Sequence, residues 1–541
     1  MPTAARDTLQ QALSHARSGN LAEAEELCED LLAQPVVDPE APHLLGVIRN
    51  IQCRYAEAEP LLRRAVAEHP AIAKYHSNLG NALRGLERLA EAEACYRWAL
   101  TLDPALDDAR VNLAKLLHTT RQWEEAIVEY MQLITRNPKD IGLQASLAFL
   151  LLSTNQIAEA EEVVAEGLKR EPTDPGMNLA MAICERRAGK FEQALRRFDT
   201  IDPAGMEVRI AAAFHYERGL LYDRLNLMER AWTEFAEGNR QQAEGIKHSR
   251  IDKTHYTKEL DRLAQMDVEW LRNVSMSGVS GTSPSPAFLV GFPRSGTTLL
   301  DQILDSHPNI QTLEEKPIVN RLCDEMDTLL LSRPGGLKAL EQGELVRLRQ
   351  NYFEYVADFI DLQPGNLLVD KLPLSITRVP YILRVFPDAR FILALRHPCD
   401  CVLSCYMHLF EPNDAMANFY TLEDTAALYA KVMGLWRHWA ERLPLRYHPV
   451  YYERLVHDLA GEIKPLLGFL GVEWRENMAR PHEHAARKGV INTPSHSQVT
   501  QPIYQRAAGR WRRYLPYLGE VMSTLEPYIE YFGYDRQESV G

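Results

Sequence analysis

The chain of 541 residues is long enough for two or three domains, and its composition, 46% hydrophobic and 25% charged, is that of an ordinary globular protein. The formal net charge of −14 argues against nucleic acid as a partner. No run of about 18 apolar residues is present, the first residues do not have the pattern of a secretory signal, and the eight cysteines do not complete a zinc site. We therefore expect a cytoplasmic protein with reduced thiols, no membrane span and no metal.

The first half of the chain repeats every 34 residues. One position holds alanine, a second holds a large apolar residue and a third holds proline: Ala24, Ala58, Ala92, Ala126, Ala160 and Ala194; Leu62, Tyr96, Tyr130, Val164 and Phe198; Pro70, Pro104, Pro138 and Pro172. Small residues let two helices cross closely, large ones fill the space between units, and proline ends a helix. This spacing resembles the tetratricopeptide repeat, which has two antiparallel helices per unit. We expect six units in phase over residues 6–205 and a seventh, out of phase, near residues 214–238.

Repeat arrays of this kind curve into a groove that binds other molecules. We therefore expect a protein or peptide partner in the groove, with a purely structural or oligomerising array as the alternative. Nothing in the repeats has the pattern of a catalytic site. Residues 246–286 follow as a charged helical segment and a Ser/Gly/Pro-rich linker.

Beyond the linker, apolar strands alternate with helical stretches, which is typical of a parallel sheet covered by helices. We expect strands at residues 287–291, 366–370, 389–395 and 447–452. Polar residues stand at their ends, with Lys371 after the second, Arg396 after the third and Tyr452 in the fourth. Ligands of such sheets bind beyond the carboxyl ends of the strands. These cationic and hydroxyl groups indicate a ligand with two or more phosphate-like groups.

The turn after the first strand has the composition of an anion site: Arg294, Ser295, Gly296, Thr297 and Thr298. Backbone N–H groups at the start of the following helix favour an anion, hydroxyls add donors, and an arginine matches phosphate or sulfate. Gly291 and Gly296 have the spacing of a nucleotide-binding P-loop, but Thr297 stands in place of its lysine, which disfavours an ordinary kinase or NTPase. A strand–turn–helix without a site is the alternative.

Residues 293–298 resemble the 5′-phosphosulfate-binding loop of sulfotransferases, and residues 391–404 resemble their 3′-phosphate-binding segment. Residues 450–453 resemble the Tyr-Glu strand end of the same family, which includes Tyr452. The likeness is greatest to protein-tyrosine sulfotransferases. The expected fold is therefore an all-α tetratricopeptide solenoid over residues 1–245, followed by an α/β P-loop-like sulfotransferase domain with a central parallel sheet over residues 287–535.

The resemblance implies a role for each matching residue. Arg294 would contact the sulfuryl group of 3′-phosphoadenosine 5′-phosphosulfate, Glu315 would be the general base, and Lys371 would steady the departing phosphate oxygen. Arg396 and Ser404 match ligands of the 3′-phosphate, and Ser495 matches a serine that faces the phosphosulfate. Arg510 stands where the family has a lysine near the 3′-phosphate. No metal is required. Left to the residues alone, Glu315 could instead be a solvated carboxylate, and Lys371 could pair with Asp370.

Departures from the family concern the acceptor more than the donor. Lys316-Pro317 replaces a Thr-Arg pair that serves the acceptor peptide, and His408 replaces an arginine near the 3′-phosphate. Three hypotheses follow: sulfation of a protein tyrosine, sulfation of a glycan, lipid or small phenol, or a repeat scaffold that binds the nucleotide without catalysis. The combination with repeats is known from bacterial sulfotransferases, so we expect a bacterial protein, and the resemblance also allows a homodimer.

Overall fold

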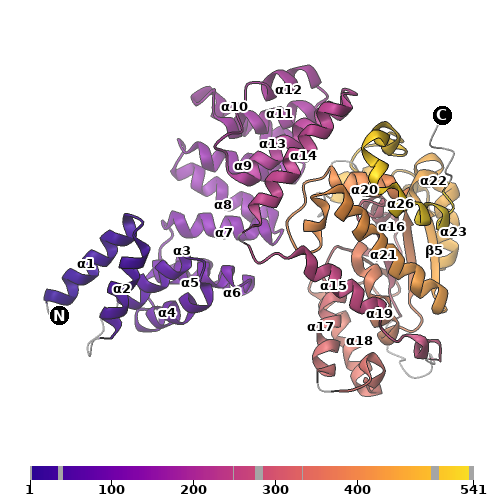
Figure 1. The fold of residues 1–541 in the computed structure, drawn as a ribbon, viewed down its shortest axis with the longest axis horizontal. Coiled ribbons are helices and arrows are strands. Elements are labelled where there is room, and N and C mark those ends of the chain that lie inside the picture. Colours follow the sequence, from indigo (N-terminus) through magenta and orange to yellow (C-terminus); the bar gives the residue numbers. More distant parts are fainter. Residues whose placement is uncertain are drawn as a thin grey trace. The chain divides into compact units, whose positions relative to one another are not determined.

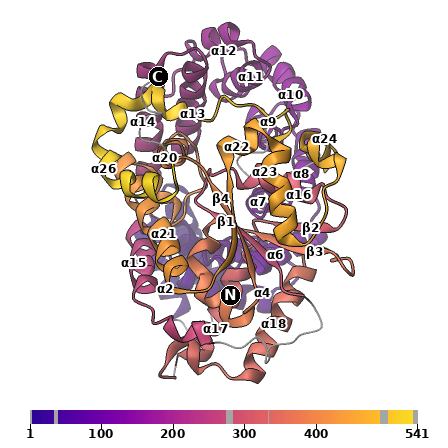
Figure 2. The ribbon, with the colours of Figure 1, turned by 90° about the vertical axis from the view of Figure 1, so that its right-hand side faces the viewer.

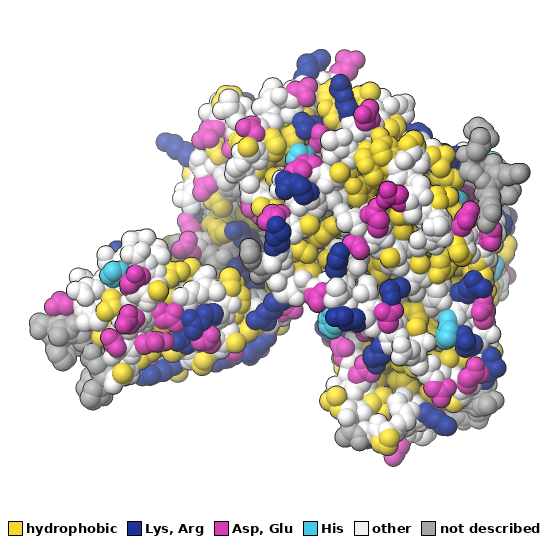
Figure 3. Space-filling model, viewed as in Figure 1, with side chains coloured by type: hydrophobic (Ala, Val, Ile, Leu, Met, Phe, Trp, Pro, Cys, Tyr) yellow, Lys and Arg dark blue, Asp and Glu magenta, His cyan; other side chains and the backbone are white. Residues whose placement is uncertain are grey.

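The computed structural model describes residues 3–33, 40–247, 249–273, 284–331, 333–488 and 499–534. The chain divides into two compact units, Met1–Ala188 and Gly189–Gly541. Among the described residues, no helix is long and apolar enough to cross a membrane. On the face drawn in Figure 3, basic and acidic side chains of the described residues are interspersed.

The described part of the first unit consists of helices that pair into successive hairpins (Figure 1). Their bounds are α1 (Thr3–Arg17), α2 (Leu21–Leu32), α3 (Glu40–Ile51), α4 (Tyr55–Glu68), α5 (Ala73–Gly85), α6 (Leu89–Leu102), α7 (Asp107–Thr119), α8 (Trp123–Arg136), α9 (Ile141–Ser153), α10 (Ile157–Arg170) and α11 (Pro175–Arg187). The repeated alanines are fully buried where the helices of a hairpin cross. The prediction of an all-α tetratricopeptide array is confirmed.

The turn inside each hairpin has a left-handed residue at one fixed position of the 34-residue period. Its occupants are Gly19, Cys53, Glu87, Arg121, Asn155 and Gly189, all with positive φ. A helix commonly ends on such a residue, because the left-handed conformation lets its N–H groups close the last turn. The next one, Asn226, comes three residues later than the period predicts. This insertion accounts for the phase shift of the seventh unit.

The connection between hairpins is held by a second periodic device. In four successive units, a polar side chain of the first helix hydrogen bonds to the carbonyl oxygen of the proline six residues earlier, at 2.8–3.0 Å: His76 to Pro70, Arg110 to Pro104, Gln144 to Pro138 and Asn178 to Pro172. The four side chains differ in chemistry but each can donate to a carbonyl. The proline therefore ends one helix and also fixes the start of the next.

The second unit begins with helices and continues as an α/β domain. The helices before the sheet are α12 (Phe191–Phe198), α13 (Val208–Arg224), α14 (Met228–Gly245), α15 (Lys253–Ala264) and the 3₁₀ turn η1 (Glu269–Asn273). The strands are β1 (Ala287–Gly291), β2 (Ile310–Glu314), β3 (Leu367–Lys371), β4 (Arg390–Leu395) and β5 (Arg446–Tyr451), all parallel in the order β2-β3-β1-β4-β5. The predicted parallel sheet is confirmed, and β2 is an additional edge strand.

Helices cover both faces of this sheet (Figure 2). Phe288 and Val290 of β1 belong to one hydrophobic core, whereas the intervening Ala287 and Leu289 belong to another. The remaining elements are α16 (Thr297–Asp305), α17 (Ile318–Leu330), η3 (Gly336–Ala339), α18 (Gln342–Ala357), η4 (Pro373–Arg378), α19 (Val379–Val385), α20 (Pro398–Tyr406), η5 (Met416–Phe419), α21 (Leu422–Arg442), α22 (Tyr452–His457), α23 (Leu459–Leu470), η6 (Glu476–Ala479), α24 (Pro481–Lys488), η7 (Arg510–Tyr514) and α26 (Leu515–Tyr531). Burial on both faces explains why β1 is a continuous apolar run rather than an alternating one.

The hairpin α13–α14, which continues the repeat pattern, packs into the core of the α/β domain. Tyr216 and Phe235 lie in the same hydrophobic core as Val290 of the central strand. The Trp232 ring stacks on Tyr406 and on Tyr517, with ring centroids 4.9 and 4.5 Å apart. The last repeat and the sheet therefore share one apolar interior.

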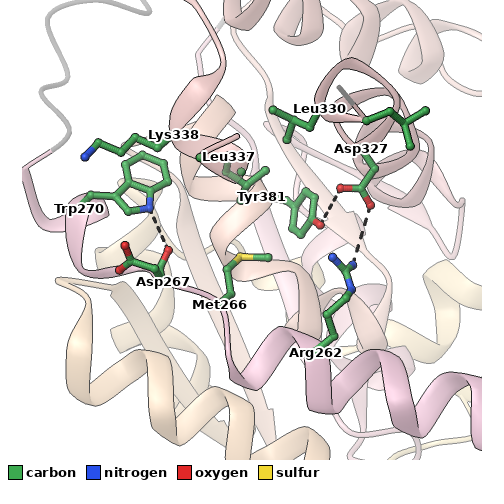
Figure 4. A pocket seen from close by; sticks show the side chains of 12 residues that line it. Arg262, Met266, Asp267, Trp270, Asp327, Leu330, Leu337, Lys338 and Tyr381 are labelled. Carbon is green, nitrogen blue, oxygen red and sulfur yellow. Dashed lines mark hydrogen bonds and ion pairs between the residues drawn. The ribbon is translucent and has the colours of Figure 1, made fainter. Parts of the chain in front are cut away.

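A shallow hollow of about 630 Å³ opens between α15, η1, α17, η3 and α19 (Figure 4). Trp270 and Tyr381 contribute aromatic rings, and the Tyr381 hydroxyl donates a 2.9 Å hydrogen bond to Asp327. Leu330 and Leu331, which also line it, are at the C-terminal end of α17, whereas Glu315 precedes the N-terminal end of that helix. None of the residues expected to bind a nucleotide lines this hollow.

Candidate functional site

The sheet order brings the expected site residues to one edge. β1 lies between β3 and β4, with Leu289 opposite Lys371 and Gly291 opposite Ala394. The turn after β1, the end of β3 and the residues after β4 are therefore neighbours. This is the point at which the chain turns from one side of β1 to the other, where open parallel sheets bind ligands.

The turn between β1 and α16 is shaped around Gly296. This residue has φ of 96° and stands immediately before the helix, and a Cβ placed on it would lie 2.6 Å from the ring of Tyr452. Any other residue would have to displace that ring. Thr297 and Thr298 are buried in the first turn of α16, and the buried Ser295 hydroxyl has no hydrogen-bond partner among the described residues. The site thus holds an unused donor beside free helix N–H groups.

Four of the expected residues form one connected network around this turn. Arg294 donates from Nε to the Ser404 hydroxyl over 3.2 Å. Arg396 donates to the carbonyl oxygen of Arg294 over 3.2 Å, and also to that of Ala507. The Arg396 guanidinium lies over the Tyr452 ring, 4.9 Å from its centroid. The turn after β1, the loop after β4 and the start of α22 are therefore fixed relative to one another.

Arg510 adds a third guanidinium. Asp400 in α20 accepts the backbone N–H groups of Gly509 and Trp511, at 2.7 and 2.9 Å, and so holds the chain on both sides of Arg510. Burial lowers the pKa of Arg294, and the positive charges of Arg396 and Arg510 lower it further. Burial alone would lower the pKa of Arg396 too, but the charge of Asp400 and of other neighbours raises it above its usual value. Three guanidinium groups near a helix N-terminus have the chemistry that recognises an anion.

Lys371 and Glu315 form a buried ion pair at the other end of the site. Lys371 is completely buried and donates to Glu315 Oε1 over 3.0 Å, with Glu314 at 3.7 Å. The backbone N–H of Glu315 also donates to the carbonyl oxygen of Lys371, over 2.7 Å. Burial alone would lower the pKa of Lys371, but the carboxylates of Glu315, Asp301 and Glu314 raise it above its usual value. Lys371 is therefore charged at neutral pH.

Backbone strain is concentrated on two of the expected catalytic residues. Arg294 has φ of 69° and Glu315 has φ of 47°. Outside the hairpin turns of the repeats, they are the only described residues other than glycine with positive φ. This conformation costs about 1–2 kcal/mol for such residues and tends to persist at functional sites. Paired contacts hold both residues in place against this cost.

Asp370 and Lys371 point to opposite sides of β3. Asp370 does not pair with Lys371, because its carboxylate accepts the Tyr352 hydroxyl over 2.7 Å in the core on the other face of the sheet. Burial raises the pKa of Asp370 to about 7. The neutral form of this carboxyl is therefore the form that the folded protein favours.

Replacing Asp370 by asparagine should stabilise the protein at high pH only. The raised pKa means that the stability contributed by the neutral carboxyl is complete below about pH 4 and is lost as the pH rises through about 7. Asp370→Asn has no charge to bury, so its free energy of unfolding should exceed that of the wild type by up to about 4 kcal/mol at pH 8 and equal it near pH 4. Urea unfolding at both pH values, with the exposed Asp199→Asn as control, measures the difference. A gain that is the same at both would contradict the assignment.

His408, one of the departures from the family pattern, lies just beyond α20. Its ring packs edge-on against Phe410, with centroids 4.8 Å apart. Burial and the nearby charge of Arg294 lower the pKa of His408 well below its usual value. It is neutral at pH 7, so the position that holds an arginine in the family contributes no charge here.

The structure joins Arg294, Arg396, Ser404 and Tyr452 in one network and Lys371 with Glu315 in an ion pair. It also adds carboxylates that sequence reasoning missed. Ser495 lies outside the described residues. Asp301, Asp400 and Asp223 support Lys371 or Arg510 without belonging to any of the recognised segments. Asp400 follows Arg396 by only four residues and lies 3.8 Å from its guanidinium, so it was close enough in the sequence to have been considered. Asp301 and Asp223 carried no such signal.

Residues 286–476 match the model of the sulfotransferase family. Models of the tetratricopeptide repeat match residues 9–73 and 73–106, and one described as the TT21 fifth ARM repeats domain matches residues 107–205. The chain thus joins a region that matches tetratricopeptide models to one that matches the sulfotransferase-family model, in agreement with the resemblance of the sequence. The Arg294 turn, Lys371 and Arg396 all fall inside the sulfotransferase-family region.

The relatives are similar to this chain over less than half of its length. A protein of Aquifex aeolicus is 29% identical over 259 residues, which are 46% of this chain and 33% of that protein. Protein-tyrosine sulfotransferase 2 of Gallus gallus is 26% identical over 46% of this chain and 69% of its own length, and the protein-tyrosine sulfotransferase of Drosophila melanogaster is 26% identical over 46% and 51%. Among solved structures, a sulfotransferase domain from the curacin biosynthetic pathway is 20% identical, with a TM-score of 0.34, over 47% of this chain and 99% of that domain. The matched stretch thus spans only a third of the Aquifex protein, and with bacterial and animal relatives the expected bacterial origin stays a prediction.

Proposed function

We propose that the protein is a sulfotransferase that moves a sulfuryl group from 3′-phosphoadenosine 5′-phosphosulfate to an acceptor hydroxyl. The observation that carries the proposal is the convergence of Arg294, Arg396 and Arg510 on a glycine-containing turn at the start of α16. Arginine recognises phosphate and sulfate groups, and a helix N-terminus adds N–H donors. Three cations suit a nucleotide that carries one anionic group at its 3′ position and another at its 5′ position.

The residues present fit this donor. The Ser295 hydroxyl and Arg396 Nε are buried and have no hydrogen-bond partner among the described residues, and both can donate to anionic oxygens. Thr297, in place of the P-loop lysine, removes the group that reaches a terminal phosphate in NTPases. The bound donor would supply the sulfuryl group and leave as 3′-phosphoadenosine 5′-phosphate.

Glu315 is the proposed proton acceptor. Lys371 donates to its Oε1 over 3.0 Å, which orients the carboxylate that would take the proton of an acceptor hydroxyl. Lys371 remains charged at neutral pH, as its role in offsetting charge on the departing oxygen requires. Arg294 and the N–H groups at the start of α16 provide fixed positive charge and donors, so that the chain's contribution is mainly positioning and electrostatic stabilisation.

We propose a protein tyrosine as the acceptor. The support is the printed names of the Gallus and Drosophila relatives, which are protein-tyrosine sulfotransferases. A peptide bound in the repeat groove would be the natural source of that tyrosine, since tetratricopeptide arrays bind peptides and proteins. A glycan, a lipid or a small phenol is the other acceptor class, and homodimer formation stays a prediction.

The proposal is tested by titrating 3′-phosphoadenosine 5′-phosphate and, separately, ATP into the protein. We expect the protein to bind the bisphosphate only. Binding should be weakened about 100-fold in Arg396→Ala, because this variant loses the hydrogen bonds to the carbonyl oxygens of Arg294 and Ala507 and the cation over the Tyr452 ring. Arg437→Ala, which removes a surface arginine of α21, should bind as the wild type does. Equal or preferred binding of ATP would overturn the donor assignment.

The acceptor is tested by label transfer from 3′-phosphoadenosine 5′-phosphosulfate to a tyrosine peptide, an oligosaccharide and a simple phenol. Transfer to the peptide with the highest kcat/KM supports the tyrosine proposal. Transfer only to the sugar or the phenol would move the function to the other acceptor class. Binding of the nucleotide without transfer to any acceptor would favour the non-catalytic scaffold.

A further inference from the structure

The last helical hairpin of the repeats, α13–α14, supplies a carboxylate to the segment that carries Arg510. Asp223, near the end of α13, is 8% exposed. It accepts the Tyr514 hydroxyl over 2.8 Å, Arg513 over 3.2 Å and Arg510 Nε over 3.3 Å. One buried carboxylate from the hairpin therefore gathers three donors of η7, the turn that contains Arg510.

Arg510 is held in two places, at the backbone on either side of it and at its guanidinium. Its backbone neighbours donate to Asp400 of α20, while its guanidinium pairs with Asp223 of α13 at 3.1 Å. Long arginine side chains lose about 2 kcal/mol of rotamer freedom when they are fixed, so a preset guanidinium binds an anion more tightly than a mobile one. Asp223 carries out part of this fixing before any ligand arrives.

The hairpin is itself positioned against α20, the helix that carries Asp400 and Ser404. Asn239 of α14 donates to the carbonyl oxygen of Tyr406 over 3.0 Å, and Gln242 donates to that of Phe410 over 3.1 Å. The carbonyl of Tyr406 is at the end of α20. Asp400 belongs to α20, and the hairpin that carries Asp223 is docked on the end of the same helix. The position of the Arg510 guanidinium therefore depends on the docking of the hairpin.

We propose that Asp223 is a positioning residue of the donor site, and that the last repeat is thereby a structural part of nucleotide binding. The inference rests on the proposed sulfotransferase function, since it assigns Arg510 to an anionic group of the donor. Asp223 acts through Arg510 and does not itself touch the nucleotide. Its removal lowers affinity for the group that Arg510 contacts rather than affinity in general.

The test is titration calorimetry on the full-length protein, with Asp223→Asn, Arg510→Ala and the double variant. Asparagine keeps the shape of the side chain and can still accept the Tyr514 hydroxyl, but removes the ion pair. We expect Asp223→Asn to bind 3′-phosphoadenosine 5′-phosphate about tenfold more weakly than the wild type, and the double variant to bind no more weakly than Arg510→Ala alone. Adenosine 5′-phosphate, which lacks the second phosphate, should lose less affinity in Asp223→Asn than the bisphosphate does.

Two further variants separate positioning from general loosening. Arg240→Ala breaks a surface ion pair within α14 that involves neither Arg510 nor the docking of the hairpin, and should bind the bisphosphate as the wild type does. Tyr514→Phe removes the hydroxyl that holds Asp223 and should weaken binding in the same direction as Asp223→Asn, by less, which also serves if Asp223→Asn does not fold.

The outcomes distinguish this inference from the function on which it rests. If the wild type binds the bisphosphate and Arg510→Ala weakens binding, while Asp223→Asn and Tyr514→Phe do not, the positioning role is refuted and the sulfotransferase proposal stands. Additive losses in the double variant, or an equal loss in Arg240→Ala, would also refute it. If the wild type does not bind the bisphosphate, both fall together.

Discussion

Glu315→Gln is expected to slow sulfuryl transfer by about 10²–10⁴-fold while changing the affinity for 3′-phosphoadenosine 5′-phosphate by less than about threefold. Glutamine keeps the size of the side chain and can still accept the hydrogen bond from Lys371, but it cannot take the proton of the acceptor hydroxyl. The strained backbone of residue 315 and its N–H bond to Lys371 are unchanged, so the geometry should survive. Single-turnover transfer and titration calorimetry on the same preparation measure the two quantities.

Glu314→Gln is the matched control for that experiment. It removes a carboxylate of the same type, one residue away, that is also near Lys371 but 3.7 Å from its nitrogen rather than 3.0 Å. We expect less than a tenfold loss of turnover. A large loss of turnover in Glu314→Gln together with near-normal turnover in Glu315→Gln would show that Glu314, and not Glu315, is the base.

Lys371→Met should lower the free energy of unfolding by about 3–5 kcal/mol and abolish turnover. Lys371 is 0% exposed and its charge is near Glu315, Glu314 and Asp301, so methionine would remove the buried positive charge that faces these carboxylates. Protonation removes the negative charge of a carboxylate, and with it the repulsion among these groups. The folded variant would therefore bind protons more tightly than its unfolded chain does. The loss of stability should accordingly be smaller at pH 5 than at pH 8, as urea unfolding at the two pH values would detect.

Combining Lys371→Met with Glu314→Gln checks the cause. Removing one of the carboxylates near residue 371 should restore part of the lost stability without restoring turnover, because these side chains interact and their effects do not add. A loss below about 1 kcal/mol in Lys371→Met, or no recovery in the double variant, would mean that the lysine does not neutralise this cluster.

Sequence patterns predicted the parts of the fold that local signals specify. The 34-residue period gave the repeats, and the apolar runs before Arg294, Lys371 and Arg396 gave three central strands whose ends form the site. The edge strand β2 was missed because Ile310–Glu314 is short and mixes polar and apolar residues, as edge strands do. Without β2, nothing local shows that Glu315 reaches Lys371, since it is the β2–β3 register that pairs Glu314 with Lys371.

The supporting carboxylates were beyond reach for a different reason. Asp223 lies 287 residues before Arg510, and it belongs to a repeat whose phase shift hides its relation to the rest of the chain. Contacts between residues so far apart in the sequence depend on how the folded hairpin docks on the folded domain. The repeat period carries no information about that docking. The roles of Glu315, Lys371 and Arg510 in catalysis and binding stay predictions that rest on the geometry described above.

The shared interior of the last hairpin and the sheet affects how this chain could be divided. Leu271, before residues 274–283, and Phe288, after them, lie in one hydrophobic core. Cutting the chain between 273 and 284 would therefore not release a free α/β domain, but would give two fragments that each expose part of that core. Co-expressed, such fragments should reassemble by complementation, whereas an exchange of repeat arrays between proteins would have to leave α13–α14 with the enzyme and join the new array ahead of it.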